Sequence, residues 1–140
     1  MRLYRTGSEE ETIALGARLS AGLPRRGVVL LIGDLGAGKT TLAKGIASGL
    51  GAASPEEVSS PTFTLIHEYG QPPGVYHVDL YRLDEARQLA SIGLEELFDR
   101  DAMILIEWGE RFLDCMPEPR VEIRIERGQG DAREIRVTGS

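Results

Sequence analysis

The residues with the clearest chemical meaning form a glycine-rich segment, Gly33-Asp34-Leu35-Gly36-Ala37-Gly38-Lys39-Thr40. It matches the pattern G-x-x-x-x-G-K-[ST] at every fixed position. Its glycines let the backbone turn tightly and approach phosphate oxygens without Cβ clashes. Successive amides then point at the ligand from the positive end of a helix dipole. We therefore expect the backbone of Leu35, Gly36, Ala37 and Gly38 to bind phosphate.

Three side chains complete this phosphate-binding loop. Lys39 is expected to reach the β- and γ-phosphates, the Thr40 hydroxyl to ligate Mg²⁺, and Thr41 to hydrogen-bond the α-phosphate. A chance glycine turn before a helix is the alternative. It is disfavoured because the segment follows a predicted buried strand and opens a predicted helix.

Two carboxylates stand where a triphosphate site needs them. Asp79 follows Val75–Val78, and Glu107 follows Met103–Ile106, so each ends a short and mostly apolar strand. In an open α/β sheet, ligands bind at the carboxyl ends of the strands. One of these acids is expected to bind Mg²⁺ and the other to polarise the attacking water. The residues alone do not say which acid has which role, and either could instead cap a helix or pair with an arginine.

Other side chains near these motifs have less specific patterns. Thr62, in Ser60-Pro61-Thr62, is either a sensor of the γ-phosphate, as in switch loops, or an ordinary loop threonine. Trp108 is either core packing or a wall of the site. His77 lies within a strand, where a lone histidine is more often packed or hydrogen-bonded than catalytic. His67 and His77 have no metal-ligand spacing that we recognise.

The elements that must position these residues alternate along the chain. A Ser8–Glu11 capping box predicts a helix to about Ala21. Apolar runs predict buried strands, and hydrophobic spacing with glycine stops predicts helices. Predicted strands span 28–32, 62–69, 75–79, 103–107, 121–127 and 134–138. Further predicted helices span 39–49, 83–98 with an interruption near Gly93, and 110–116.

This order predicts an α/β fold. We expect a single three-layer P-loop NTPase-like domain over residues 1–140, with a mixed, mainly parallel sheet and a C-terminal antiparallel hairpin. In strand 121–127, the strict alternation of Val121, Ile123 and Ile125 with charged residues predicts that the hairpin has one wet face.

The composition limits the functional classes and the cellular compartments with which the chain is compatible. The chain has 140 residues and a net charge of −6. Without a sustained basic patch, direct and tight nucleic-acid binding is disfavoured. Apolar runs such as Val28–Ile32 are far shorter than the ~20 residues of a membrane span, and the N-terminus lacks the apolar stretch of a secretion signal. Cys115 is the one cysteine, which suits a reducing compartment. We expect a cytoplasmic protein.

The nucleotide is expected to be ATP. Guanine-specific P-loop proteins usually read the base with an Asn-Lys-x-Asp motif, and this chain contains no asparagine. From the residues alone, a small-molecule kinase remains an alternative, although no arginine-bearing lid insertion stands out. A nucleotide-dependent binding switch with incidental hydrolysis is another.

Taken together, four blocks resemble one family. They are Gly33–Thr41, Ser60–Leu65 (SPTFTL), Tyr76–Leu83 (YHVDLYRL) and Ile106–Trp108 (IEW). In this order they are similar to TsaE (formerly YjeE), the ATPase of bacterial tRNA threonylcarbamoyladenosine (t6A) biosynthesis. The resemblance spans nearly the whole chain, and the last three blocks are much more specific than the phosphate-binding loop.

The resemblance implies roles that composition does not give. Family members bind and hydrolyse ATP and associate with the TsaB–TsaD pair, which modifies an adenosine beside the tRNA anticodon. The family therefore implies protein partners, with tRNA reached through the complex. Carried over to this chain, Thr40 and Glu107 contact Mg²⁺, Asp79 is the Walker-B-like acid, and Thr62 belongs to a switch-like loop. Trp108 abuts the site, and Glu9 and Arg133 lie near the adenine end of the nucleotide.

Overall fold

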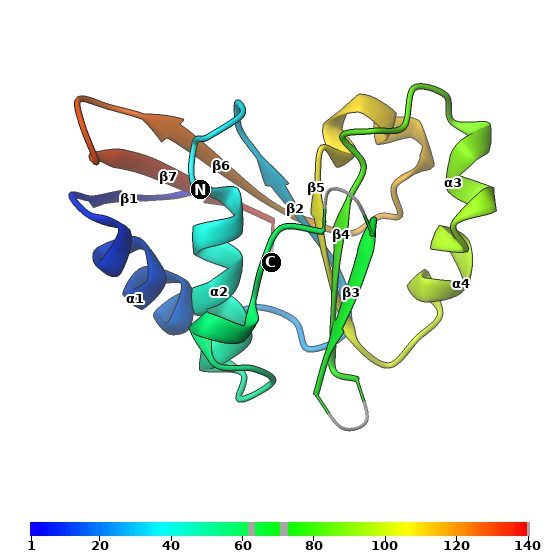
Figure 1. The fold of residues 1–140 in the computed structure, drawn as a ribbon, viewed down its shortest axis with the longest axis horizontal. Helices are drawn as coiled ribbons and strands as arrows, with labels where there is room; N and C mark the ends of the chain where they lie inside the picture. The colour runs from blue at the N-terminus through cyan, green and yellow to red at the C-terminus, as the bar shows by residue number, and fades with distance from the viewer. Residues whose placement is uncertain (62–63, 71–72, 140) are drawn as a thin grey trace.

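The computed structural model describes residues 1–61, 64–70 and 73–139, which build one seven-stranded sheet with helices on both faces (Figure 1). Its strands are β1 (Arg2–Thr6), β2 (Gly27–Ile32), β3 (Ile66–Tyr69), β4 (Val75–Asp79), β5 (Met103–Glu107), β6 (Val121–Arg127) and β7 (Arg133–Thr138). Its α-helices are α1 (Glu9–Ser20), α2 (Lys39–Gly49), α3 (Arg87–Ser91) and α4 (Leu94–Phe98), and its 3₁₀ helices are η1 (Pro55–Glu57) and η2 (Gly109–Cys115).

The strands follow the order β1-β7-β6-β2-β5-β4-β3. Neighbours among β6, β2, β5 and β4 pair in parallel at the centre of the sheet. The pairs β1–β7, β7–β6 and β4–β3 are antiparallel and form the two edges. The α/β fold, the mixed sheet and the C-terminal hairpin are confirmed, with parallel pairing confined to the buried centre.

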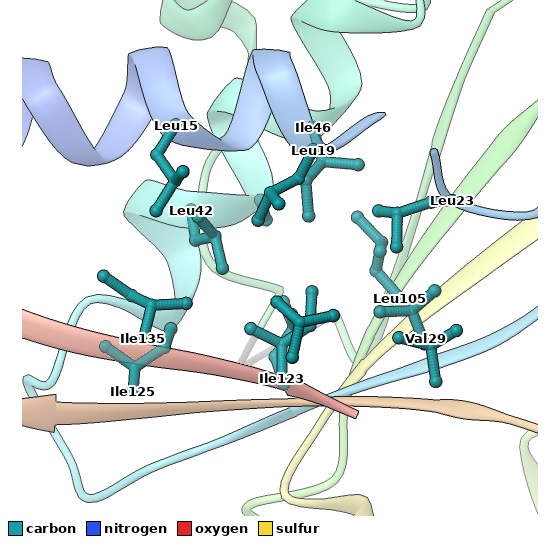
Figure 2. Packing of buried hydrophobic residues seen from close by; sticks show 14 of the residues in the cluster. Leu15, Leu19, Leu23, Val29, Leu42, Ile46, Leu105, Ile123, Ile125 and Ile135 are labelled. Carbon is teal, nitrogen blue, oxygen red and sulfur yellow. The ribbon is translucent and has the colours of Figure 1, made fainter. Parts of the chain in front are cut away.

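Alternate residues of the central strands feed two separate cores, one on each face. Val29 and Leu31 of β2 pack under α1 and α2, whereas Leu30 packs on the other face with leucines of α3 and α4. Figure 2 shows the first core, in which Leu15 and Leu19 of α1 and Leu42 and Ile46 of α2 lie over the sheet. The three predicted layers are therefore present.

The wet face of the hairpin is also confirmed. Val121, Ile123 and Ile125 of β6 are buried beneath α1 and α2, while Arg124 and Glu126 on the opposite face are exposed.

Sequence reasoning missed β1. Residues 2–6 offer no apolar alternation, and four of the five are exposed or half-buried. Among the described residues the strand pairs with β7 alone, so its place is set by hydrogen bonds at a sheet edge rather than by a hydrophobic pattern.

Two predicted elements are shorter in the structure. Residues 62 and 63 of the predicted strand 62–69 lie outside the described residues, and β3 begins at Ile66, because Leu65 has a φ of 72°, which extended backbone does not allow. The predicted helix 83–98 begins at Arg87 and is divided into α3 and α4 by Gly93, whose φ is 75°. The predicted helix 110–116 is the 3₁₀ helix η2, which is kinked at Phe112.

The start of α1 realises half of the predicted capping box. The Ser8 hydroxyl accepts a hydrogen bond from the Glu11 amide at 3.1 Å. The Glu11 carboxylate, however, accepts from the Gly7 amide at 2.7 Å rather than from Ser8. The Glu11 amide is one that the first helical turn leaves without a partner, whereas Gly7 lies just before the N-cap.

Glycines let α1 and α2 approach each other closely. A Cβ at Gly16 would lie 2.6 Å from the carbonyl oxygen of Leu42 and 3.0 Å from Gly45 Cα. The two helices are therefore in direct backbone contact, which brings the N-terminus of α1 close to the loop that precedes α2.

Within the described ranges, no helix has both the length and the apolar character that a membrane crossing requires.

Candidate functional site

The loop between β2 and α2 has the geometry that its glycines predict. Gly36 and Gly38 have φ values of 80° and 113°, which L side chains rarely adopt, and Gly38 is the N-cap of α2. Gly33 serves a different purpose, because a Cβ there would lie 2.6 Å from the carbonyl oxygen of Ile125 in β6. Two glycines thus shape the turn, while the third lets it lie against the neighbouring strand.

Lys39, the first residue of α2, is almost completely buried, with 4% of its surface exposed. Its Nζ donates a hydrogen bond to the carbonyl oxygen of Gly33 at 2.5 Å and lies 3.5 Å from the ring centroid of Trp108. Burial lowers the pKa of Lys39, and the negative charges of Glu107 and Glu110, among others, partly offset that effect. The ammonium group is thus a desolvated cation held at the base of the loop.

The two predicted carboxylates lie side by side. Asp79 and Glu107 are register partners at the carboxyl ends of the parallel strands β4 and β5, and both are buried. The Thr40 hydroxyl donates to Glu107 Oε2 at 3.0 Å. Asp79 Oδ1 accepts from the Tyr81 amide at 2.8 Å, and Asp79 Oδ2 lies 3.5 Å from the Ser60 hydroxyl. Both acids therefore have fixed orientations beside the start of α2.

A cavity of about 290 Å³ joins these groups at the carboxyl edge of the sheet. Its lining consists of Leu35, Gly36, Gly38, Lys39, Thr40, Thr41, Ser60, Asp79, Tyr81, Glu107 and Trp108. It thus collects almost every residue that the sequence predicted for the site. The predicted Thr62 lies outside the described residues.

A smaller cavity of about 110 Å³ continues the site on the other side of the loop. It shares Gly36, Gly38 and Thr41 with the first cavity, and its lining includes Glu9 and Arg133. Arg133 Nε also donates to the carbonyl oxygen of Ala37 at 2.7 Å, which ties the hairpin to the loop. Ala37 is a buried residue of the loop and lines neither of these two cavities.

Two aromatic residues form the wall beside Lys39. Trp108 has a φ of 67°, which turns the chain sharply after β5 and directs the indole to the mouth of the site. Its ring centroid lies 5.2 Å from that of Tyr81. Trp108 thus lines the cavity and also packs against the core on the α3 and α4 face. Tyr81 was missed, because its position depends on the tight turn that Asp79 caps.

His77 is the other buried polar residue at this edge. It is fully buried in β4, and its Nε2 lies 2.6 Å from Glu107 Oε2. The prediction that it is hydrogen-bonded is confirmed. Its partner could not be predicted, because the contact depends on how β4 and β5 are aligned.

The oxygen donors at this edge could supply part of the coordination shell of a magnesium ion. Within the described part of the chain, no group of three or more His, Cys, Asp or Glu side chains could hold a metal ion alone. Mg²⁺ in phosphate-binding sites is commonly held by one or two protein ligands, with phosphate oxygens and waters completing its shell. Thr40 and the neighbouring acids provide such an incomplete set.

A buried strand, a glycine-rich loop and a helix that opens with Lys39-Thr40 define the P-loop class of α/β domains. Within that class, the model of the family described as "Threonylcarbamoyl adenosine biosynthesis protein TsaE" matches residues 6–135, and the chain belongs to this family. The family is therefore one of tRNA threonylcarbamoyladenosine biosynthesis proteins.

Individual relatives agree with the family model. The tRNA threonylcarbamoyladenosine biosynthesis protein TsaE of Bacillus subtilis (strain 168) is 44% identical over 138 residues, covering 96% of this chain and 84% of that protein. The protein of the same name from Haemophilus influenzae is 41% identical, covering 79% of this chain and 68% of its own. The crystal structure of B. subtilis YdiB superposes with a TM-score of 0.77 at 36% identity, covering 99% of this chain and 84% of that one.

Proposed function

We propose that this protein binds and hydrolyses ATP and that this activity is required for the threonylcarbamoyl modification of adenosine beside the tRNA anticodon. It acts on the TsaB–TsaD transferase complex in the cytoplasm and reaches tRNA through that complex. The carrying observation is the meeting of the Lys39-Thr40 pair with Asp79 and Glu107 in one cavity, in a chain of this family.

The loop and Lys39 hold the phosphates. The amides of residues 35–38 lie at the positive end of α2, where they stabilise phosphate oxygens. An ammonium group has three donors, so Lys39 can keep its hydrogen bond to Gly33 and still donate to the β- and γ-phosphates. Because the group is buried, its charge is screened less than it would be in water. The smaller cavity, with Glu9 and Arg133, takes the adenosine end.

The two acids have different roles in this proposal. Thr40 and Glu107 would hold Mg²⁺, which when bound neutralises charge on the β- and γ-phosphates. Their proximity favours this pairing, since the Thr40 hydroxyl donates to Glu107 Oε2 at 3.0 Å and both residues line the cavity. Asp79, fixed by the Tyr81 amide, orients the attacking water. Trp108 covers Lys39 and limits the access of other water to it.

The test measures ATP hydrolysis by the pure protein with and without TsaB–TsaD, while tRNA modification is followed in the same reactions. We expect slow hydrolysis that rises with the partners, and modified tRNA only when this chain is present. Lys39→Ala should reduce turnover by about 100–1000-fold, because a charge placed on the transferring phosphate is lost. Lys44→Ala is the matched control, since it removes the same charge from the same helix outside the cavity.

Three results would count against the proposal. Hydrolysis that ignores the partners and leaves tRNA unmodified would remove the pathway role. Phosphoryl transfer to a metabolite in the absence of partners would establish a small-molecule kinase instead. Equal turnover in Lys39→Ala and Lys44→Ala would remove the site assignment.

A further inference from the structure

We propose that His77 is the positioning residue for Glu107: its Nε2–H holds one carboxylate oxygen in place so that Glu107 receives the Mg²⁺ of the nucleotide without rearranging. This inference rests on the proposed function, because it assigns a support to the same site. His77 itself touches neither phosphate nor metal in this scheme.

The contact is a defined one. Glu107 Oε2 accepts from two donors on different elements, the Thr40 hydroxyl on α2 at 3.0 Å and His77 Nε2 on β4 at 2.6 Å. Because a carboxylate accepts, the imidazole must carry its proton on Nε2. The side chain of Glu107 is thereby clamped between the helix that follows the loop and the neighbouring strand.

The presence of a histidine in this buried strand requires an explanation. All five residues of β4 are buried, and His77 has no exposed surface. Its Nδ1 is also buried and has no hydrogen-bond partner among the described residues. A proton on Nδ1 would be a buried donor without an acceptor, whereas a proton on Nε2 faces Glu107 Oε2, so the geometry favours the tautomer that carries its proton on Nε2. An apolar side chain would avoid the unsatisfied nitrogen, which means that stability alone does not favour histidine here.

The topology explains why β4 provides this support. His77 lies two residues before Asp79 on the same face of β4, and its register partner Leu105 lies two residues before Glu107 in β5. The histidine therefore precedes the pair of acids by two residues along the strands, and its Nε2 contacts Glu107 Oε2 on the neighbouring strand. Thr40 approaches the same oxygen from above. If Thr40 turns its hydroxyl toward a ligand, the His77 hydrogen bond still keeps the carboxylate in position.

The experiment compares His77→Gln with His77→Asn. The glutamine amide nitrogen reaches about as far from the backbone as Nε2, whereas that of asparagine reaches only as far as Nδ1. Calorimetry gives the affinity for a non-hydrolysable ATP analogue in excess Mg²⁺ and in EDTA. In His77→Asn, we expect the gain in affinity that Mg²⁺ gives over EDTA to be about 10–100-fold smaller than in the wild-type protein, with the affinity in EDTA unchanged. His77→Gln should retain most of the gain.

His67→Gln is the matched control. His67 is the chain's other histidine, the cross-strand neighbour of His77 in β3, and it lies outside both cavities of the site. Its substitution should leave the gain from Mg²⁺ at the wild-type level. A wild-type gain in His77→Asn, or an equal loss in His77→Gln, would overturn the positioning role.

A measurement on the wild-type protein does not depend on whether the variants fold. Nitrogen-15 histidine NMR, with His67→Gln assigning the two rings, should show a proton on His77 Nε2 that is protected from solvent exchange. A proton on Nδ1 would overturn the proposal. If the wild-type protein bound no nucleotide while this protected proton was observed, the proposed function would fail and the hydrogen bond would stand.

Discussion

The close approach of α1 and α2 gives a prediction whose magnitude follows from the structure. In Gly16→Ala, the new Cβ would meet three backbone atoms, at 2.6 Å from Leu42 O and 3.0 Å from Gly45 Cα and Ile46 N. Backbone atoms cannot rotate away as a side chain can. Since ordinary contacts begin near 3.5 Å, the helices must separate by about 1 Å.

Two opposing terms decide the result. Alanine in a helix interior is favoured over glycine by about 1 kcal/mol. Overpacking typically costs about 1–3 kcal/mol or more, and here separation also loosens Leu15 and Leu19 of α1 from Leu42 and Ile46 of α2. We expect the free energy of unfolding to fall by about 1–3 kcal/mol, which lowers the melting temperature by roughly 3–10 °C.

Thermal unfolding followed by circular dichroism measures this change. Gly22→Ala is the matched control, because Gly22 lies just beyond α1 and its Cβ would meet only Leu19 O, at 3.9 Å. That variant should melt within a few degrees of the wild-type protein, since surface changes usually stay within about 0.5 kcal/mol. If Gly16→Ala melted at or above the wild-type temperature, the reasoning about backbone contact would be refuted.

Three further predictions concern the site. Trp108 is the chain's one tryptophan, so nucleotide binding should change its emission through the adjacent Lys39, and calorimetric binding without any change in emission would contradict their contact. Arg133→Leu should weaken nucleotide binding about tenfold by releasing the Ala37 carbonyl, and an unchanged dissociation constant would show that the loop does not need this support. Burial raises the pKa of Glu110, so its stabilising contribution is complete below the unfolded pKa and is lost as the pH rises through the folded pKa. Glu110→Gln should therefore melt above the wild-type protein at neutral pH, with a gap that closes near about pH 4, and a gap that widens in acid would reverse the assigned sign.

Local patterns were sufficient for the centre of the fold. The central strands β4 and β5 and the helix α2 have the predicted bounds, because a short, mostly apolar run and a glycine-rich loop each have few alternative structures. Both acids could be placed at one edge because parallel strands end on the same side. Sequence patterns were insufficient at the edges of the fold. There β1 has no buried face that would give an apolar alternation, and α3 begins several residues after the predicted start of the helix.

Contacts between segments that are distant in the chain could not be predicted from local sequence patterns. The hydrogen bond between His77 and Glu107 joins residues 30 apart in the chain. It depends on β4 and β5 being neighbours in a particular register, which no local pattern encodes. Tyr81 was missed for a different reason, because its place at the site depends on a local turn in which Asp79 accepts a hydrogen bond from the Tyr81 amide.

The charges of the site support the proposal that its ligand is a cation-bound nucleotide. Lys39 is surrounded by the carboxylates of Glu107, Glu110, Asp79 and Asp34, and each of them acts on its pKa. One buried ammonium group thus faces several acids before any phosphate arrives. A free triphosphate would add more negative charge beside Asp79 and Glu107, in an interior where repulsion is poorly screened. A divalent cation would offset that repulsion, so the proximity of the two acids supports the magnesium complex, rather than the free nucleotide, as the proposed ligand.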